Sequence, residues 1–165
     1  MDKDNLMIFL RRQKENRGAM ASLRCLLNDE QRFRGWQLIA SINGIGDAAV
    51  ETVSGLYAMH PEENSDTDYN FGDACRALAM NRKTMEVNDE SPFDRRFRRL
   101  LSCDTREELR LHLVDIVRGM KSANISVNYA GLYQDMVWWG NKVRERWAIH
   151  YWSNRKVETA ENVSD

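Results

Sequence analysis

The sequence predicts an all-α protein, and three observations support that prediction. Apolar residues recur at helical spacing along most of the 165-residue chain, and β-branched residues rarely alternate with polar ones. Only two prolines and nine glycines interrupt this pattern. Apolar residues make up 42% of the chain, which is enough to build a core. We expect about eight to nine helices, in one domain or in two small lobes.

The first half of the chain is expected to hold five helices separated by short turns. Their expected ranges are 4–15, 19–27, 30–42, 47–60 and 70–80. Gly18 suits the left-handed end of the first helix, and Asn28 or Asp29 offers an N-cap for the third. The segment NGIG predicts a turn. Small residues between Ala48 and Ala58 indicate that the fourth helix packs closely against its neighbours.

The second half carries clearer boundary signals. Ser91 and Pro92 predict an N-cap and a first helical residue, with that helix ending near Ser102. Asp104, with Glu107 three residues later, predicts a capping box for the next helix. One face of that helix is apolar and consists of Leu109, Leu113, Ile116, Val117 and Met120. Two further helices are expected at 128–139 and 141–154, with an end or a kink at Gly140.

A polar connector, NRKTMEVNDE, is the best candidate for a boundary between two helical lobes. It divides the chain into an N-terminal lobe at 1–86 and a C-terminal bundle at 87–156. Residues 157–165 are polar and acidic, and we expect a disordered tail there.

Four of the five tryptophans lie between residues 135 and 152, among several cations. At 100° per residue, Trp139 and Trp147 share an arc with Leu132, Met136, Val143, His150 and Tyr151, which predicts a buried stripe. Trp138, Ile149 and Trp152 fall on a different arc. We therefore expect Trp139 and Trp147 in the core, and Trp138 and Trp152 at an interface with another subunit.

The net charge of −1 hides a strong segregation of charge along the chain. Residues 1–40 carry a net charge of +3, residues 41–90 carry −7, residues 91–156 carry +6 and the tail carries −3. The two basic regions could face one polyanion, or their charges could only solvate helix surfaces. We expect the acidic segment 61–73 to face a basic patch on a neighbouring subunit, or only water.

Catalytic and cofactor sites find little support in the sequence. Cys25, Cys75 and Cys103 fit no metal spacing or disulfide framework, so buried reduced thiols are expected. No histidine has an acid or thiol at ligand spacing, except that His112 and Asp115 could pair on one helix. No phosphate-binding loop or nucleophile motif occurs. We expect no enzyme activity, no metal and no cofactor. The order of charges at the N-terminus is not that of a secretory signal, and no apolar run is long enough to span a membrane, so we expect a cytoplasmic protein.

An ordered set of segments resembles the CasB-type small subunit of the type I-E CRISPR Cascade complex. In the C-terminal half these segments are SPFDRRFRRLLSCDTREELRLHL, ANISVNYAGLYQDMVWW and KVRERWAIHYW. Earlier in the chain, NRGAMASLR, GLYAMHP and NFGDACRAL match other elements of the family in the same order. The resemblance covers residues 6–152.

The resemblance implies a compact, two-lobed helical protein without a catalytic site, acting in antiviral defence. It implies two copies lying head to tail in a guide-RNA-bound assembly. There the subunit would contact other Cascade subunits, the guide–target hybrid and the displaced DNA strand, and would help to hold the R-loop open. Cutting would be left to a separate helicase-nuclease.

Basic residues at the matching positions are expected to contact nucleic acid. Arg17 and Arg24 lie in the family's Arg-Gly and Leu-Arg elements, and Arg95 and Arg96 lie in its Arg-Arg-Phe element, with Phe97 turned into the core. Arg99 lies one turn later and extends the same surface. The remaining candidates are Lys142, Arg144 and Arg146 before Trp147, and Arg110 and Arg118. These last two flank Val114 and Asp115, which stand where the family commonly has an arginine.

Two other functions remain open at this stage. The chain could be a helical adaptor that binds only protein. It could also be a helix-turn-helix regulator that reads DNA sequence through residues 128–155, although only Asn141 is suited to reading a base there.

Overall fold

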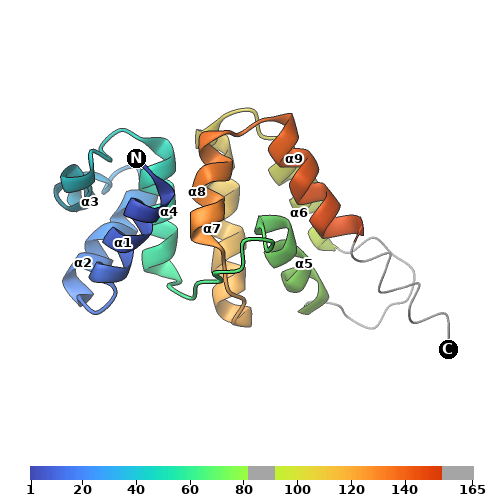
Figure 1. Ribbon diagram of the computed structural model, residues 1–165, viewed down its shortest axis with the longest axis horizontal. Helices are drawn as coiled ribbons and strands as arrows, with labels where there is room; N and C mark the ends of the chain where they lie inside the picture. The colour runs from blue at the N-terminus through green and yellow to red at the C-terminus, as the bar shows by residue number, and fades with distance from the viewer. Residues whose placement is uncertain (82–91, 154–165) are drawn as a thin grey trace.

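The computed structural model describes residues 1–81 and 92–153, and this part of the chain is all-α, as predicted (Figure 1). Nine α-helices lie in these residues: α1 Lys3–Gln13, α2 Arg17–Arg24, α3 Phe33–Ile39, α4 Ala48–Met59, α5 Phe71–Asn81, α6 Pro92–Leu101, α7 Arg106–Ala123, α8 Tyr129–Val137 and α9 Asn141–Ala148. Along the longest axis, α1–α3 form one end, α4, α7 and α8 the middle, and α5, α6 and α9 the other end.

The early helices begin at side-chain caps. Asp2 accepts a hydrogen bond from the backbone N–H of Asp4, Asn16 from that of Ala19, and Asp47 from those of Ala49 and Val50. The expected cap at Asn28 or Asp29 is wrong. Residues 28–32 form turns in which Asn28 accepts from the N–H of Glu30, and α3 begins only at Phe33.

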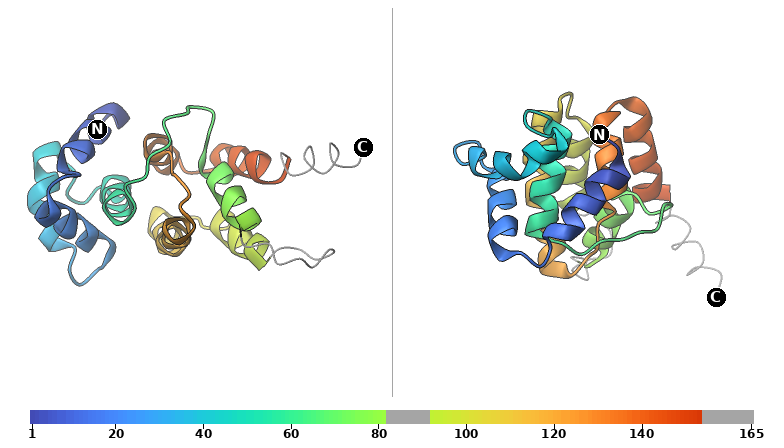
Figure 2. Two further views of the ribbon diagram at one scale, coloured as in Figure 1. Left: turned by 90° about the horizontal axis from the view of Figure 1, so that it is seen from below. Right: turned by 60° about the vertical axis from the view of Figure 1, so that its left-hand side comes forward.

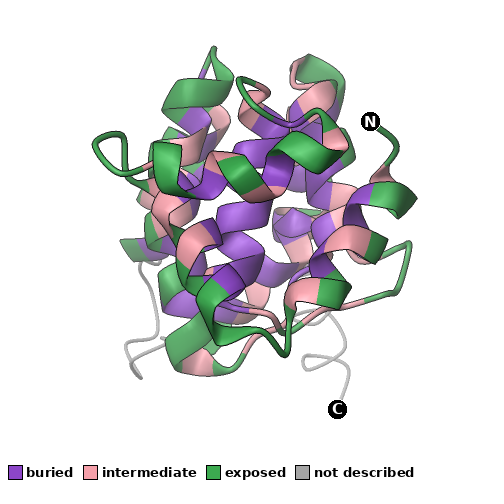
Figure 3. Ribbon diagram, turned by 90° about the vertical axis from the view of Figure 1, so that its left-hand side faces the viewer, coloured by how far each residue is buried: buried purple, intermediate pink, exposed green. Residues whose placement is uncertain are grey.

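Helix α4 is buried on every side. All ten residues from Ala49 to Ala58 are buried, because α1, α2, α7 and α8 pack around this helix. Gly55 allows the close approach that the small residues predicted, since a Cβ there would lie 2.6 Å from Cγ of Leu27. A helix buried on every side lies at the centre of a protein, and α4 lies between α1–α3 on one side and α7 and α8 on the other (Figure 1). Figure 3 shows the buried residues gathered in the interior of the molecule.

The C-terminal helices follow the predicted pattern with one shift. All five residues of the predicted apolar face of α7 are buried. The capping box of this helix is formed by Thr105 and Glu108, one residue later than predicted, and Glu108 also accepts from the backbone N–H of Asp104. Helix α8 begins at Tyr129, close to the predicted start, and Asn128 is its N-cap. The helical path is interrupted at Gly140, between α8 and α9. A π-helical turn, Ile149–Ser153, follows α9.

Helix α5 packs against the elements that follow it in the sequence, namely α6, α7, α9 and the π-turn. Figure 2 shows α5 beside α6. Phe71 at the start of α5 lies 5.1 Å from Trp147, measured between ring centroids. The predicted boundary at residues 86 and 87, the proposed cap Ser91 and the tail 157–165 lie outside the described residues. The division into lobes therefore stays a prediction, and α5 contributes to the core of the later bundle.

The tryptophans divide largely as predicted. Trp147 is fully buried, and Trp139 packs against it with ring centroids 5.0 Å apart. Trp139 is half-buried and donates to the carbonyl of Cys103 at 2.8 Å. Trp138 is 77% exposed. Trp152 is half-buried and its ring packs edge-on against Phe97, and its place at a subunit interface stays a prediction.

The cysteines are free thiols, with Cys75 and Cys103 buried and Cys25 only half-buried. Within the described residues, no helix is both long and apolar enough to cross a membrane.

The contact between α5 and Trp147 gives a prediction about stability. A Cβ at Gly72 would lie 2.3 Å from the backbone oxygen of Trp147, so Gly72→Ala should lower the free energy of unfolding by about 1–3 kcal/mol. Gly18→Ala is the control, because a Cβ there meets nothing closer than 3.5 Å and alanine favours a helix. Urea denaturation measures both variants, and equal stability of the two would contradict the packing described.

Candidate nucleic-acid interface

Helix α6 presents a row of arginines to solvent. Phe93, Phe97 and Leu100 bury the opposite side of the helix, and Phe97 stacks on Tyr151 with ring centroids 4.0 Å apart. The exposed side carries Arg95, Arg98 and Arg99, beside a half-buried Arg96. This set of four residues is called the α6 arginine face below. Phe97 lies in the core, as the resemblance implied.

The four arginines of this face have different freedom to bind a ligand. Arg96 lies with its guanidinium carbon 5.6 Å from the centroid of the Phe93 ring, so part of its side chain covers the core. Arg98 takes part in an interaction within the chain. Arg95 and Arg99 are exposed and form no ion pair in the described part of the chain. They lie four residues apart and so project from the same side of the helix.

The basic residues of α9 have three different environments. Lys142 is exposed. Arg144 is 24% exposed; it donates to the carbonyl of Cys103, pairs with Asp104 at 3.3 Å and lies over the ring of Trp139. Arg146 is 60% exposed and pairs with Asp135 at 3.0 Å. Arg144 therefore holds α9 against the loop before α7, and the predicted assignment to nucleic acid fits Lys142 and Arg146 better.

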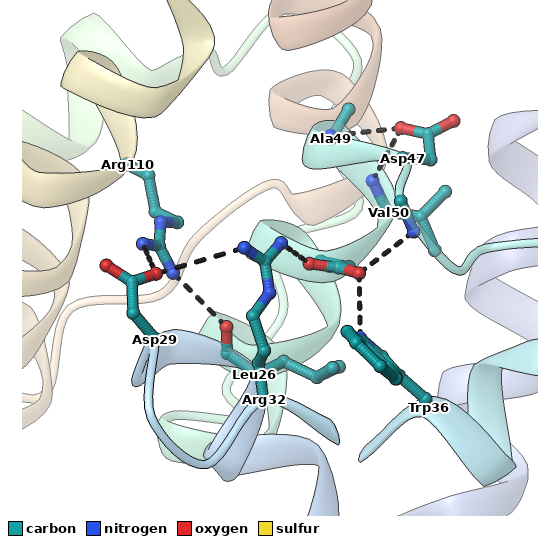
Figure 4. Close-up of polar contacts among 10 residues, drawn as sticks. Leu26, Asp29, Arg32, Trp36, Asp47, Ala49, Val50 and Arg110 are labelled. Carbon is teal, nitrogen blue, oxygen red and sulfur yellow. Dashed lines mark hydrogen bonds and ion pairs between the residues drawn. The ribbon is translucent and has the colours of Figure 1, made fainter. Parts of the chain in front are cut away.

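Arg110 is also occupied within the fold (Figure 4). Its side chain is 12% exposed, pairs with Asp29 and donates to the carbonyl of Leu26 at 3.3 Å. Arg32 approaches Asp29 from the other side and forms an ion pair with the buried Glu51. Glu51 also accepts hydrogen bonds from the indole of Trp36 and the backbone N–H of Gly46. This polar cluster joins the turn before α3 to α4 and α7.

Val114 and Asp115 stand where the family commonly has an arginine, and the neighbouring arginines Arg110 and Arg118 are both engaged within the chain. Arg118 pairs with Asp115 at 3.3 Å on the surface of α7, and Arg110 belongs to the cluster around Asp29. The sequence left open a pair of His112 with Asp115, and in the structure Asp115 contacts Arg118 instead.

The candidate residues do not form one continuous patch. Arg17 and Arg24 lie on α2, near one end of the molecule, whereas the α6 arginine face and α9 lie at the other (Figure 1). Arg17 is exposed without a polar partner in the described residues, and Arg24 donates to the carbonyl of Ala58 at 3.3 Å. A polyanion that contacted all of them would have to extend along most of the molecule.

One histidine has an acidic partner that the sequence did not predict. Nδ1 of His150 lies 2.6 Å from a carboxylate oxygen of Asp73, which joins the π-turn to α5. The two residues are 77 positions apart, so no spacing rule could have found them. His60 is buried, with Nε2 2.6 Å from the carbonyl of Ile125. No cluster of three potential metal ligands occurs among the described residues.

The acidic segment 61–73 makes contacts within the chain as well as with solvent. Glu63 pairs with Arg11 of α1 at 2.8 Å, and Asp73 contacts His150. The expectation that this segment meets only a neighbouring subunit or water is therefore wrong for these two residues.

Asp135 is the buried anchor of Arg146. One carboxylate oxygen accepts from the indole of Trp147 at 2.8 Å, and the other pairs with Arg146. Burial raises the pKa of Asp135, and the hydrogen bond from Trp147 and the charge of Arg146 offset part of that rise. Asp135 thus holds the exposed guanidinium of Arg146 beside the end of α8.

Comparisons with known proteins agree with the helical fold. The family of CRISPR-associated protein Cse2 matches residues 9–152. The crystal structure of CasB from Thermus thermophilus superposes with a TM-score of 0.67 at 22% identity, covering 93% of this chain and 99% of that chain. That of M. ruber CasB superposes with a TM-score of 0.71 at 20% identity, covering 99% and 98%. No curated protein sequence matches the chain.

Stability measurements should separate the arginines that build the fold from those that are free. Arg110→Ala removes the hydrogen bond to the Leu26 carbonyl and should lower the free energy of unfolding by about 1–2 kcal/mol. Arg95→Ala is the matched control and should change it by less than about 0.5 kcal/mol. Chemical denaturation measures both, and a large loss in Arg95→Ala would mean that this side chain has a structural partner.

The raised pKa of Asp135 predicts a pH dependence. The carboxyl of Asp135 binds a proton more tightly in the folded state than in the unfolded state. Protonation of Asp135 therefore stabilises the fold below the unfolded pKa of about 3.9, and this contribution is lost as pH rises through the raised folded pKa. Asp135→Asn lacks this titration. The stability of the wild type relative to Asp135→Asn should therefore fall with rising pH over that window, as measured by denaturation between about pH 4 and pH 7. A difference that stays constant with pH would contradict the raised pKa.

Proposed function

The chain belongs to the CRISPR-associated Cse2 family, and from that premise we propose that it is a non-catalytic subunit that binds nucleic-acid backbone and stabilises the R-loop on target DNA. Membership in the family and the similarity to solved structures named CasB support a role as a Cascade subunit in CRISPR interference. Its proposed partners are the other subunits with their guide RNA, the target and displaced DNA strands, and a second copy of the chain.

The α6 arginine face carries this proposal. Arg95 and Arg99 have no ion pair in the described part of the chain, whereas Arg110, Arg118, Arg144 and Arg146 each pair with an acid. Apolar residues hold the other side of the helix firmly in the core, so the charged side chains project from a rigid support. Cations fixed in this way bind phosphates without reading bases.

The energetics of R-loop formation suit such a surface. In a guide-RNA complex, base pairing supplies the sequence specificity, and the RNA–DNA hybrid is about as stable as the duplex that it replaces. A few phosphate contacts can therefore tip the balance towards the open form. Each contact releases condensed counterions, so this contribution must weaken as the salt concentration rises.

Charge reversal on α6 tests the proposed function. Arg95→Glu with Arg99→Glu should weaken binding of matched duplex DNA by the guide-loaded complex at least tenfold near 0.1 M salt. It should also reduce the slope of log affinity against log salt by roughly 2, one unit for each lost phosphate contact. Both side chains are exposed, so circular dichroism should show an unchanged helical fold.

The control makes the same change of charge at the C-terminal end of α1, at the other end of the molecule. Arg12→Glu with Lys14→Glu alters two exposed residues that are not among the candidates and should leave DNA affinity nearly unchanged. If both double variants bind DNA like the wild type, the α6 site is wrong, and an adaptor that binds only protein becomes the better description. Tight binding of one duplex sequence by the free chain would instead favour a sequence-reading regulator.

A further inference from the structure

A groove lies at the corner where the chain turns from α8 into α9. Its volume is about 790 Å³, and its lining includes Gln134, Trp138, Lys142, Glu145, Arg146 and Ile149. We call it the corner groove. The break at Gly140 creates it, because the chain leaves α8 there and returns as a separate helix.

The corner groove exposes apolar surface that the fold does not use. Trp138 is 77% exposed and Ile149 is 56% exposed, so neither side chain covers the core. Trp139 and Trp147 pack against each other, but the indole of Trp138 has no aromatic partner among the described residues. A large ring left open beside a second apolar side chain is a surface suited to stacking.

Charged groups beside the ring favour an anionic ligand. Lys142 is exposed and has no acidic partner in the described residues, and Arg146 keeps 60% of its side chain exposed while Asp135 fixes its position. Asp135 also lines the groove, but its carboxylate is buried and engaged by Arg146 and Trp147. Glu145 is the acid in the lining that faces solvent, opposed by the two cations.

Polar groups continue from the corner groove into a smaller hollow of about 220 Å³ that shares Gln134, Asp135 and Arg146 with it. Asn70, Asn128 and His150 lie along this second hollow. An exposed ring with two cations in the lining of the same groove forms the set of groups that binds an unpaired nucleotide. A purely apolar protein side chain would leave the cations without partners.

We propose that the corner groove binds an unpaired nucleobase of a single strand, stacked on the indole of Trp138, with the adjoining phosphates against Lys142 and Arg146. This site is separate from the α6 arginine face, because the described residues that line the corner groove include none from α6. The proposal rests on one part of the proposed function, namely that the chain binds nucleic acid. It adds a contact with the flat face of a base, which any base can make.

The test compares two strands of equal length, one a thymidine oligonucleotide of about 12 residues and the other the same sugar–phosphate backbone without bases. Fluorescence anisotropy measures their affinities for the full chain at low salt. The wild type should prefer the strand with bases by roughly 5-fold to 100-fold, the usual range for one stacked base. Trp138→Ala should abolish that preference and leave the affinity for the abasic strand unchanged, whereas Trp138→Phe should keep part of it.

Two further variants separate the possible outcomes. Phe33→Ala removes an exposed aromatic ring at the other end of the molecule and should leave the preference intact. Arg95→Glu with Arg99→Glu should weaken binding of both strands equally. If this variant weakens neither, the α6 site is wrong, but the preference for the strand with bases still tests the role of Trp138. The stacking proposal is overturned if the wild type binds both strands equally or neither, or if Trp138→Ala keeps the preference. Equal weakening of both strands by Trp138→Ala also overturns it, because the ring would then not act on the bases.

Discussion

The burial of α4 is the constraint on which the rest of this structure depends. Ten consecutive residues without exposed surface require neighbours on every side, and α1, α2, α7 and α8 supply them. Because Gly55 has no side chain, Leu27 can pack directly against α4 at this point. The Glu51 cluster then orients the segment before α3, because a buried carboxylate needs its Arg32, Trp36 and Gly46 donors.

A second centre of packing forms around Trp147 and Tyr151, between α5, α6 and α9. This centre gives the proposed sites their rigidity. Phe97 anchors the helix that carries the α6 arginine face, and the hydrogen bond from Trp147 to Asp135 fixes the acid that holds Arg146. Both surfaces therefore project from side chains in one aromatic core, and a loss of packing there would loosen both.

The sequence predicts what depends on local pattern and fails where partners are distant. The buried face of α7 and the core position of Trp147 follow from a 3.6-residue period, and both are confirmed. The capping box was placed one residue early because Asp104 and Thr105 are both good caps with an acid three residues later. The arginines show the limit most clearly. Arg110 and Arg95 look alike in sequence, but Arg110 meets an aspartate 81 positions away, and only the folded chain reveals this.

The packing of α5 has a consequence for synthesis of the chain on the ribosome. Asp73 in this helix pairs with His150, 77 residues later, so at about 5–20 residues per second α5 is synthesised roughly 4–15 seconds before that partner. During that interval Phe71, Cys75 and Leu78 have an apolar face without a neighbour from α9. Completion of the fold is thus a late, C-terminal event. A nascent chain that stalls before α9 has α6 and α7 to pack against α5, but it leaves exposed the part of α5 that α9 and the π-turn cover.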